Sequence, residues 1–258
     1  MTKIISLLVI LIVGGLAAWW LTPKPLVNYG YKVVNKIPHD RGAFTQGLLF
    51  HEGFFYESTG GYGTSSVRKV QLEGGVVRLR WDLDASLFGE GLTLWDNQLV
   101  QITWRSRKGF VYDLDGLKLA REFTYNSEGW GLTTNGVDLF MSDGSDKIYV
   151  LNPMTFTNRR NLEVHDSKGP IKNLNELEYI EGKIWANIWQ TDDLVIINPQ
   201  NGRVEGRLSL KGLRSTQDTY GGEDVLNGIA YDADEKRIFV TGKRWAYIYQ
   251  IELERKSP

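Results

Sequence analysis

From Tyr29 onward, the chain alternates between short apolar stretches and short polar turns. Each repeat begins with small residues, continues as an apolar run, turns within a few polar residues and returns as a second apolar run. In one example, Leu92 to Trp95 is followed by Asp96-Asn97-Gln98 and then by Leu99 to Ile102. Short connections that contain Gly or Asn between apolar runs are typical of β-hairpins. The pattern therefore predicts an all-β chain built from hairpins.

The first strand of each hairpin starts with a related motif, so the hairpins form a repeat. The five motifs are Phe44-Thr45-Gln46-Gly47-Leu48, Phe88-Gly89-Glu90-Gly91-Leu92, Gly129-Trp130-Gly131-Leu132, Leu174-Asn175-Glu176-Leu177 and Leu226-Asn227-Gly228-Ile229. Counted from Gln46, successive motifs lie 44, 40, 45 and 52 residues apart. A third strand follows in every unit, and a fourth, more polar strand follows in all units but the last.

Units of four strands at this period are typical of a β-propeller. Tyr31 to Ile37 forms a predicted strand without a hairpin partner, whereas the last unit lacks a fourth strand. We therefore predict a five-bladed β-propeller, with four antiparallel strands per blade and a ring closed by the N-terminal strand. An open β-sandwich with chance similarity between hairpins is the alternative, and the near-constant spacing disfavours it. The Gly-His and Trp-Asp pairs of WD40 repeats are absent.

Equivalent positions in a propeller form rings around the central axis, because the innermost strands run side by side. The inner column of this repeat comprises Gln46, Glu90, Trp130, Asn175 and Asn227. A second column, at the end of the following strand, comprises Gly60, Trp104, Gly144, Trp189 and Lys243. Antiparallel pairing places both columns on one face, which predicts a pocket with apolar walls and a few polar groups. Each residue also has a purely structural explanation, such as packing between blades for the tryptophans and turn capping for the asparagines.

Composition narrows the possible chemistry. The chain of 258 residues contains no cysteine, which excludes disulfides, thiolate nucleophiles and Cys-ligated metals. The three histidines, His39, His51 and His165, have no metal-ligand spacing, so no metal site is expected. The formal net charge is −1 with no long run of one sign, which indicates that the chain has no nucleic-acid surface.

Residues 1–28 differ from the rest of the chain. Ile4 to Leu21 is an almost unbroken apolar run behind Lys3, and as a helix it would span roughly 27 Å. A signal peptide cut near Ala17 and a retained membrane anchor both fit, and the apolar run past the candidate cut favours retention. Either reading exports residues 29–258, the predicted propeller domain. The expected location is periplasmic or otherwise extracytoplasmic, either secreted or tethered to the membrane by the N-terminal helix.

Two further motifs accompany the repeat: His39-Asp40-Arg41-Gly42-Ala43 and Ile196-Ile197-Asn198-Pro199. In order and spacing, the motifs resemble the glutamine cyclotransferase family of the plant-latex and bacterial type, from about Tyr31 to Leu253. The resemblance implies a five-bladed propeller that converts N-terminal glutaminyl residues to pyroglutamyl residues and releases ammonia. The substrates would be peptides or proteins with N-terminal Gln, and the family differs from the animal enzymes of the same activity, which use a zinc-dependent α/β fold. We expect a monomer without a cofactor.

The resemblance also implies roles for individual residues. Glu90 would be the catalytic carboxylate, with Lys243 and Asn175 as its catalytic partners. The substrate-binding residues would be Gln46, Asn227, Trp104, Trp130, Trp189, Phe44 and Phe88. One alternative is a non-catalytic exported propeller that binds peptides or scaffolds an envelope assembly. Another is a calcium-dependent hydrolase, which would need several carboxylate ligands where the inner column has only Glu90.

Overall fold

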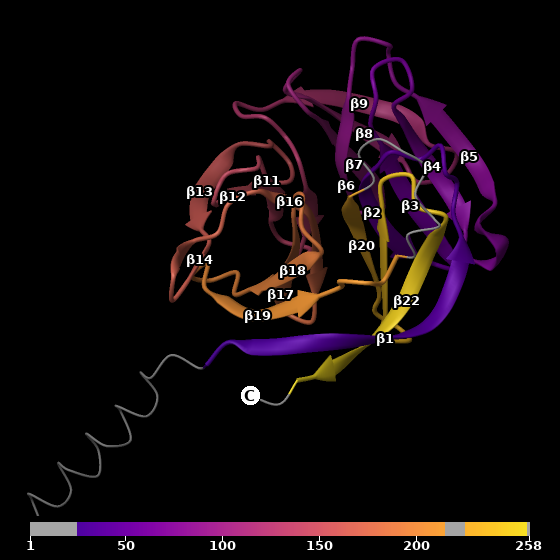
Figure 1. Ribbon diagram of the computed structural model, residues 1–258. Coiled ribbons are helices and arrows are strands. Elements are labelled where there is room, and N and C mark those ends of the chain that lie inside the picture. The colour runs from indigo at the N-terminus through magenta and orange to yellow at the C-terminus, as the bar shows by residue number, and fades with distance from the viewer. Residues whose placement is uncertain (1–24, 215–224, 257–258) are drawn as a thin grey trace, which may run out of the picture.

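The computed structural model describes residues 25–214 and 225–256 of the chain (Figure 1). The predicted N-terminal helix lies outside these residues. Within them, the only helical element is a single 3-10 turn, η1 (Glu73–Gly75), and no helix is long and apolar enough to span a membrane. The prediction of an all-β chain is confirmed.

Most strands form groups of four consecutive antiparallel strands. The first group contains β2 (Thr45–His51), β3 (Phe54–Thr59), β4 (Ser66–Gln71) and β5 (Val77–Asp82). The second contains β6 (Gly89–Trp95), β7 (Gln98–Thr103), β8 (Lys108–Asp113) and β9 (Lys118–Thr124). The third contains β10 (Leu132–Thr134), β11 (Leu139–Ser142), β12 (Lys147–Leu151) and β13 (Asn158–Glu163). The fourth contains β16 (Leu174–Ile180), β17 (Lys183–Ile188), β18 (Asp193–Ile197) and β19 (Val204–Ser209).

The remaining strands complete the fold. The last group combines β20 (Leu226–Asp232), β21 (Arg237–Gly242), β22 (Tyr247–Arg255) and β1 (Val27–Pro38). A small hairpin joins β14 (His165–Asp166) to β15 (Gly169–Pro170). The first strands of the five groups contact one another in the closed order β2, β6, β10, β16, β20 and back to β2. The result is a propeller-like arrangement of sheets around these inner strands.

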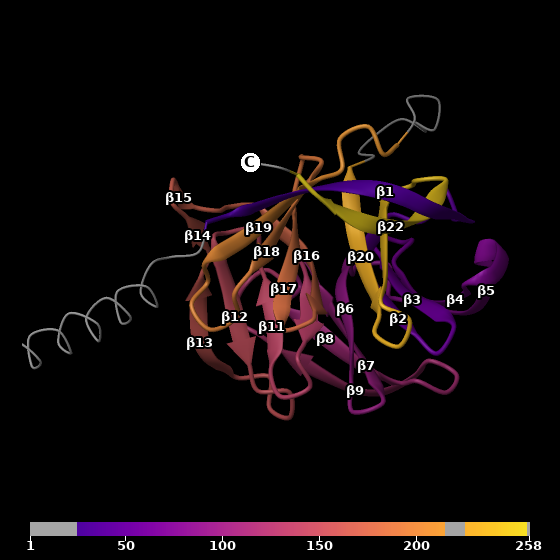
Figure 2. The same cartoon turned by 90° about the horizontal axis from the view of Figure 1, so that it is seen from below.

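β1 links the two ends of the chain. It pairs antiparallel with β22, from Tyr29 opposite Arg255 to Pro38 opposite Tyr247, which confirms the predicted pairing of the N-terminal strand with the last unit. Its first residues also run parallel to β19, with Val27 opposite Gly206. Both views show β1 passing from β19 to β22 (Figures 1 and 2). This parallel contact was not predicted, and it joins the fourth and last groups into one eight-stranded sheet.

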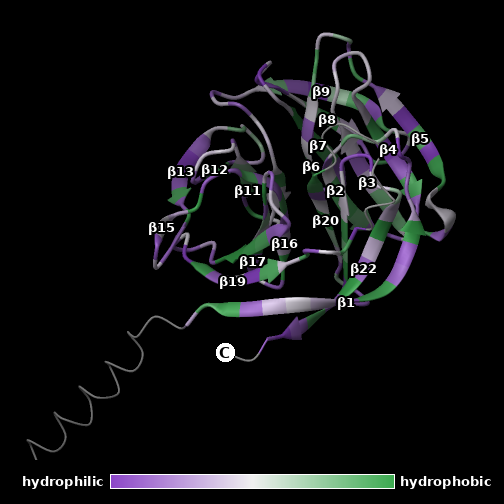
Figure 3. Cartoon of the chain, viewed as in Figure 1, coloured by the Kyte–Doolittle hydropathy of each residue, from purple (hydrophilic) through white to green (hydrophobic). Residues whose placement is uncertain are grey.

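The apolar core lies between neighbouring groups. One cluster packs Leu49 and Tyr56 of the first group against Leu99 and Phe110 of the second. The outermost strands β5, β9 and β13 are almost entirely exposed, and polar residues are frequent along them (Figure 3). Burial therefore decreases from the inner to the outer strand of a group, as expected when sheets pack face to face around an axis.

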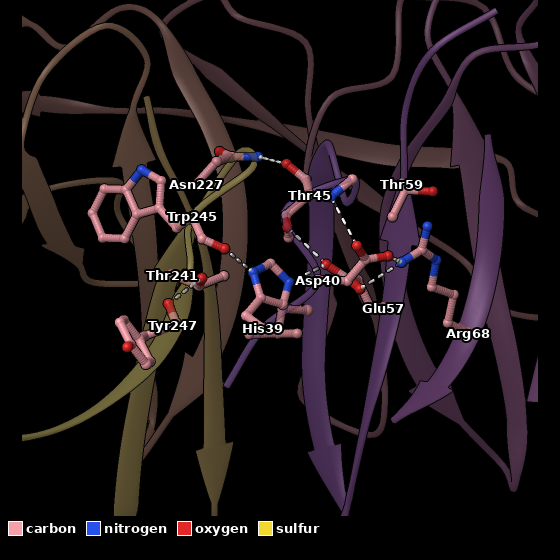
Figure 4. Close-up of polar contacts among 12 residues, drawn as sticks. His39, Asp40, Thr45, Glu57, Thr59, Arg68, Asn227, Thr241, Trp245 and Tyr247 are labelled. Carbon is pink, nitrogen blue, oxygen red and sulfur yellow. Dashed lines mark hydrogen bonds and ion pairs between the residues drawn. The ribbon is translucent and has the colours of Figure 1, made fainter. Parts of the chain in front are cut away.

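A buried polar cluster joins the first group to the last (Figure 4). The Nδ1 atom of His39 donates to the backbone oxygen of Trp245 at 2.9 Å, and its Nε2 atom donates to Glu57 Oε1 at 2.9 Å. Because both partners are acceptors, the ring carries both protons and is an imidazolium. Arg68 lies 2.7 Å from Asp40 Oδ2 and 3.9 Å from Glu57 Oε2.

The pKa values of this cluster follow from its charges. Burial alone would lower the pKa of His39, but the charge and hydrogen bond of Glu57 outweigh burial and raise it. Burial alone would raise the pKa of Glu57, but His39 and Arg68 lower it. The cluster is therefore a charged network held inside the protein.

Candidate active site

A cavity of about 230 Å³ lies where the inner strands begin. Nine of the ten residues predicted from the sequence line it: Phe44, Gln46, Phe88, Glu90, Trp104, Trp130, Asn175, Trp189 and Lys243. The tenth, Asn227, lies behind Gln46, with its side chain buried. Of the polar groups, Glu90 is 5% exposed and Lys243 is 3% exposed.

Irregular strand pairing at the start of the inner strands sets the direction of the inner-column side chains. The register shifts between Thr45 and Gly47 in β2, Gly89 and Leu92 in β6, Leu174 and Leu177 in β16, and Leu226 and Ile229 in β20. Four of the five inner-column side chains, all but Trp130, therefore sit at bulges, which interrupt the alternation of faces and redirect single residues. The recurrence of small residues in the repeat motif reflects this local geometry.

Two glycines of the motif let the inner strands approach closely. A Cβ atom on Gly91 would lie 2.5 Å from the backbone nitrogen of Leu132, and one on Gly131 would lie 2.0 Å from the backbone oxygen of Asn175. Both distances are too short for any other residue without movement of the backbone. The close approach brings the inner-column side chains within reach of one another.

A chain of hydrogen bonds holds the Glu90 carboxylate. Gln46 Nε2 donates to Glu90 Oε1 at 2.9 Å. Asn227 Nδ2 in turn donates to Gln46 Oε1 at 3.1 Å and to the backbone oxygen of Thr45 at 3.0 Å. Asn227 thus fixes the orientation of the Gln46 amide, and Gln46 presents a donor to the carboxylate.

Aromatic side chains form the walls. The rings of Phe88 and Trp104 meet at 62° with their centroids 5.6 Å apart, and Trp130 meets Trp189 edge to face at 5.4 Å. Lys243 Nζ lies 4.8 Å from the centroid of the Phe44 ring, a cation–π distance. The cavity therefore combines an acid, an ammonium group and apolar walls shielded from bulk water.

Comparisons with known proteins identify the family. The family model for glutamine cyclotransferase matches residues 7–253. The chain belongs to the glutamine cyclotransferase family. A glutaminyl-peptide cyclotransferase of Arabidopsis thaliana is 44% identical over 230 residues, covering 88% of this chain and 72% of the relative. The crystal structure of Myxococcus xanthus glutaminyl cyclase superposes with a TM-score of 0.85 at 32% identity, covering 90% of this chain and 100% of that chain.

Within this cyclotransferase site, Asn175 presents a buried acceptor. Its Oδ1 atom has no hydrogen-bond partner in the described part of the chain. Leaving a buried acceptor without a donor costs about 1–3 kcal/mol. A ligand N–H group in the cavity would satisfy it, which makes Asn175 suited to contact a substrate amine or amide.

Glu128 is a cavity-supporting residue that sequence reasoning missed. Its Oε2 atom accepts from Trp104 Nε1 at 2.8 Å and from Trp130 Nε1 at 3.3 Å, so one carboxylate holds two of the three wall indoles. Arg105 Nε lies 3.3 Å from Glu128 Oε1, and the Arg105 guanidinium stacks 3.9 Å from the Trp104 ring centroid. The available signal was its place two residues before Trp130, outside both columns.

No metal ligand set accompanies the site. Across residues 25–214 and 225–256, no group of three or more His, Asp or Glu side chains is placed to hold a metal ion. The groups that face the cavity are one carboxylate, one ammonium group, two carboxamides and aromatic rings. Such a set suits proton transfer and charge stabilisation on a small polar substrate.

Proposed function

We propose that this enzyme converts the N-terminal glutaminyl residue of peptides or proteins to a pyroglutamyl residue and releases ammonia. Its family and its relatives support this activity. The observation that carries the proposal is the Glu90 carboxylate, held by Gln46 inside an aromatic-walled cavity. At about 230 Å³, the cavity is smaller than the roughly 300–1,000 Å³ typical of sites for drug-sized ligands, which suits a single residue.

The reaction is an intramolecular aminolysis. The α-amino nitrogen attacks the γ-carboxamide carbon, a C–N bond closes the five-membered ring, and the C–N bond to the departing nitrogen breaks. The nucleophile is already tethered, so the enzyme holds the folded-back conformer and transfers protons. An α-amino group has a pKa of about 7.7–8.0, so much of it must lose a proton at neutral pH.

Glu90 is the proposed proton shuttle. Its carboxylate removes a proton from the α-amino nitrogen and delivers one to the leaving nitrogen, so that ammonia departs and the carboxylate is regenerated. General acid–base catalysis of this kind contributes about 10²–10⁴-fold. Gln46 orients the carboxylate through Oε1, with the Asn227 side chain behind it.

Lys243 and Asn175 act on the substrate. The Lys243 ammonium stabilises the negative charge that develops on the carboxamide oxygen as the tetrahedral intermediate forms. The Asn175 Oδ1 atom accepts a hydrogen bond from a substrate N–H group, which supplies the donor that this buried acceptor otherwise lacks among the described residues. The three tryptophans and two phenylalanines exclude water, and this strengthens both interactions.

The deciding test is Glu90→Gln, which keeps the shape of the side chain and removes its ability to take up a proton. Turnover of a short Gln-initiated peptide, followed by mass spectrometry as loss of one ammonia, should fall at least 100-fold. The melting temperature should stay close to that of the wild type. Glu122→Gln, an exposed carboxylate on β9, is the matched control. Undiminished turnover in Glu90→Gln would exclude the mechanism, and no turnover in the wild type would favour a non-catalytic binding protein.

We further propose that the five groups of strands are the five blades of the propeller, with residues 1–28 as signal peptide or anchor and 29–258 as the catalytic domain. The cyclic contacts of β2, β6, β10, β16 and β20 support the blade count. The proposed location is extracytoplasmic, and the proposed state is a monomer. Fractionation and N-terminal sequencing of the mature protein test the location, and sedimentation tests the oligomeric state.

A further inference from the structure

A second hollow adjoins the active-site cavity. It has a volume of about 490 Å³, and Phe44 and Phe88 line both spaces. The two phenyl rings meet edge to face with their centroids 6.1 Å apart, so they form the boundary between the inner cavity and this outer groove. A volume of this size lies within the range of about 300–1,000 Å³ that small-molecule sites occupy. The outer groove is therefore large enough to hold the part of a substrate that extends beyond the inner cavity.

The turn between β3 and β4 forms one side of the outer groove. Gly60, Gly61 and Thr64 of this turn line the groove. A Cβ atom at position 60 would lie 2.2 Å from Phe88 Cε1, so only a glycine lets the phenyl ring lie against the turn. The Phe88 ring is therefore seated on the turn, with one part toward the inner cavity and another toward the outer groove.

Tyr62, in the middle of the same turn, carries an exposed aromatic ring. The residue is 57% exposed, and its ring meets that of Phe88 at 72° with the centroids 5.5 Å apart. The Phe88 ring also contacts Trp104, a wall of the inner cavity, at 5.6 Å. Single exposed aromatic residues are common on protein surfaces. Tyr62 differs from these because its ring continues the aromatic wall of the active site out to the solvent.

Hydrogen bonds fix the backbone of this turn relative to Phe88. The Gly61 oxygen accepts from the backbone nitrogens of Thr64 at 3.0 Å and Ser65 at 2.9 Å, and from Ser65 Oγ at 2.8 Å. Ser65 Oγ in turn accepts from the backbone nitrogen of Gly89, the residue after Phe88, at 2.9 Å. A ligand that binds to a surface already fixed in this way loses less affinity to the ordering of loops.

From this geometry we infer that the outer groove binds the residue that follows the N-terminal glutamine, and that Tyr62 selects for a large apolar or aromatic side chain there. The inference rests on the proposed function. With the glutamine side chain in the inner cavity, a peptide that leaves past Phe44 and Phe88 enters the outer groove. A large side chain beside Tyr62 and Phe88 buries apolar area, and an aromatic one adds edge-to-face contacts.

The test compares C-terminally amidated tripeptides that differ only at the second position: Gln-Phe-Gly, Gln-Leu-Gly and Gln-Ala-Gly. Wild-type kcat/KM should be about three- to tenfold higher for the Phe peptide than for the Ala peptide, with the Leu peptide between them. Most of the difference should lie in KM, because a contact away from the reacting atoms stabilises the bound substrate and the transition state alike.

Variants assign the preference to Tyr62. In Tyr62→Ala, the Phe-to-Ala ratio of kcat/KM should fall toward one, whereas Tyr62→Phe keeps the ring and should keep the wild-type ratio. Each ratio is taken within one protein, so an effect of the substitution on the inner cavity cancels. The matched control is Trp81→Ala, which removes another exposed aromatic side chain, on outer strand β5, and should keep the wild-type ratio.

A binding measurement separates the outcomes further. Dissociation constants of the same peptides with Glu90→Gln protein do not depend on turnover, and they should show the same order of preference. Equal kcat/KM for all three peptides, or a preference that survives in Tyr62→Ala, would overturn the inference while leaving the proposed function standing. No ammonia release from any peptide would overturn both.

Discussion

The buried charged cluster of His39, Glu57 and Arg68 makes a strong prediction about stability. Glu57→Gln keeps the shape of the side chain but removes the negative charge that faces two cations. The side chains of His39 and Glu57 are 2% and 1% exposed, so water cannot solvate the His39 cation in place of the lost carboxylate. Removing one partner of a buried ion pair costs about 3–5 kcal/mol. We expect a loss near the lower figure, about 3 kcal/mol, because Arg68 keeps its contact with Asp40.

The pH dependence of this loss follows from the signs of the pKa shifts. The pKa of His39 is raised, so its contribution is complete below the unfolded value of about 6.5 and disappears as pH rises through the folded value. The pKa of Glu57 is lowered, so its contribution is complete above about 4.5 and disappears as pH falls through the folded value. The difference between wild type and Glu57→Gln should therefore be largest between about pH 4.5 and 6.5 and shrink on either side.

The assay is thermal and urea-induced unfolding, followed by near-ultraviolet circular dichroism across this pH range. For a domain of this size, a loss of about 3 kcal/mol corresponds to about 6–12 °C in melting temperature. Glu122→Gln on the exposed face of β9 is the control and should shift it by less than about 2 °C. A Glu57→Gln protein within about 1 kcal/mol of the wild type at pH 6, or a difference that does not vary with pH, would refute the charged network.

Three further predictions concern the site and the central strands. Asn227→Ala removes the donor that orients the Gln46 side chain, so kcat should fall about tenfold with little change in KM. Steady-state kinetics measure both constants. An unchanged kcat would show that Asn227 does not act through the hydrogen-bond chain to Glu90. Glu128→Ala removes the acceptor that holds the indoles of Trp104 and Trp130, so KM should rise about five- to tenfold. Glu128→Gln should restore KM in part. If the two variants have the same KM, the Glu128 carboxylate does not position the two indoles. Burial raises the pKa of Glu178 to about 8, so its ionisation destabilises the fold as pH rises from about 4.5 to 8. Glu178→Gln should flatten that decline in unfolding free energy, and parallel curves for the two proteins would contradict the shift.

The alternation of apolar runs and turns predicts much of this fold. The hairpins follow from local pattern, and the pairing of β1 with β22 follows from one strand without a partner and one unit without a fourth strand. The parallel contact of β1 with β19 could not be predicted, because it joins the outer edges of two sheets and leaves no periodic signal. Whether this contact forms depends on where the fold places the two sheet edges in space.

The active site, like the fold, could be predicted from the sequence only in part. The columns place Gln46 and Glu90 together because equivalent positions recur at the same bulge. They do not specify side-chain direction, and for this reason Asn227 was expected in the cavity although its amide turns toward Thr45 and Gln46. Glu128 lies in a connection outside both columns, so only the positions of the two indole N–H groups reveal its role.

The pairing of β1 with β22 has a consequence for the order in which the protein folds. Tyr29 of β1 pairs with Arg255 of β22, so the sheet that contains both cannot be completed until synthesis has reached Arg255. Bringing such distant segments together costs about 5 kcal/mol of loop-closure entropy, and contacts of high sequence separation form slowly. Until β1 pairs with it, the edge of β22 stays open to association with other chains. A circular permutant that carries β1 directly after β22 should therefore refold faster than the natural order while keeping the same active site.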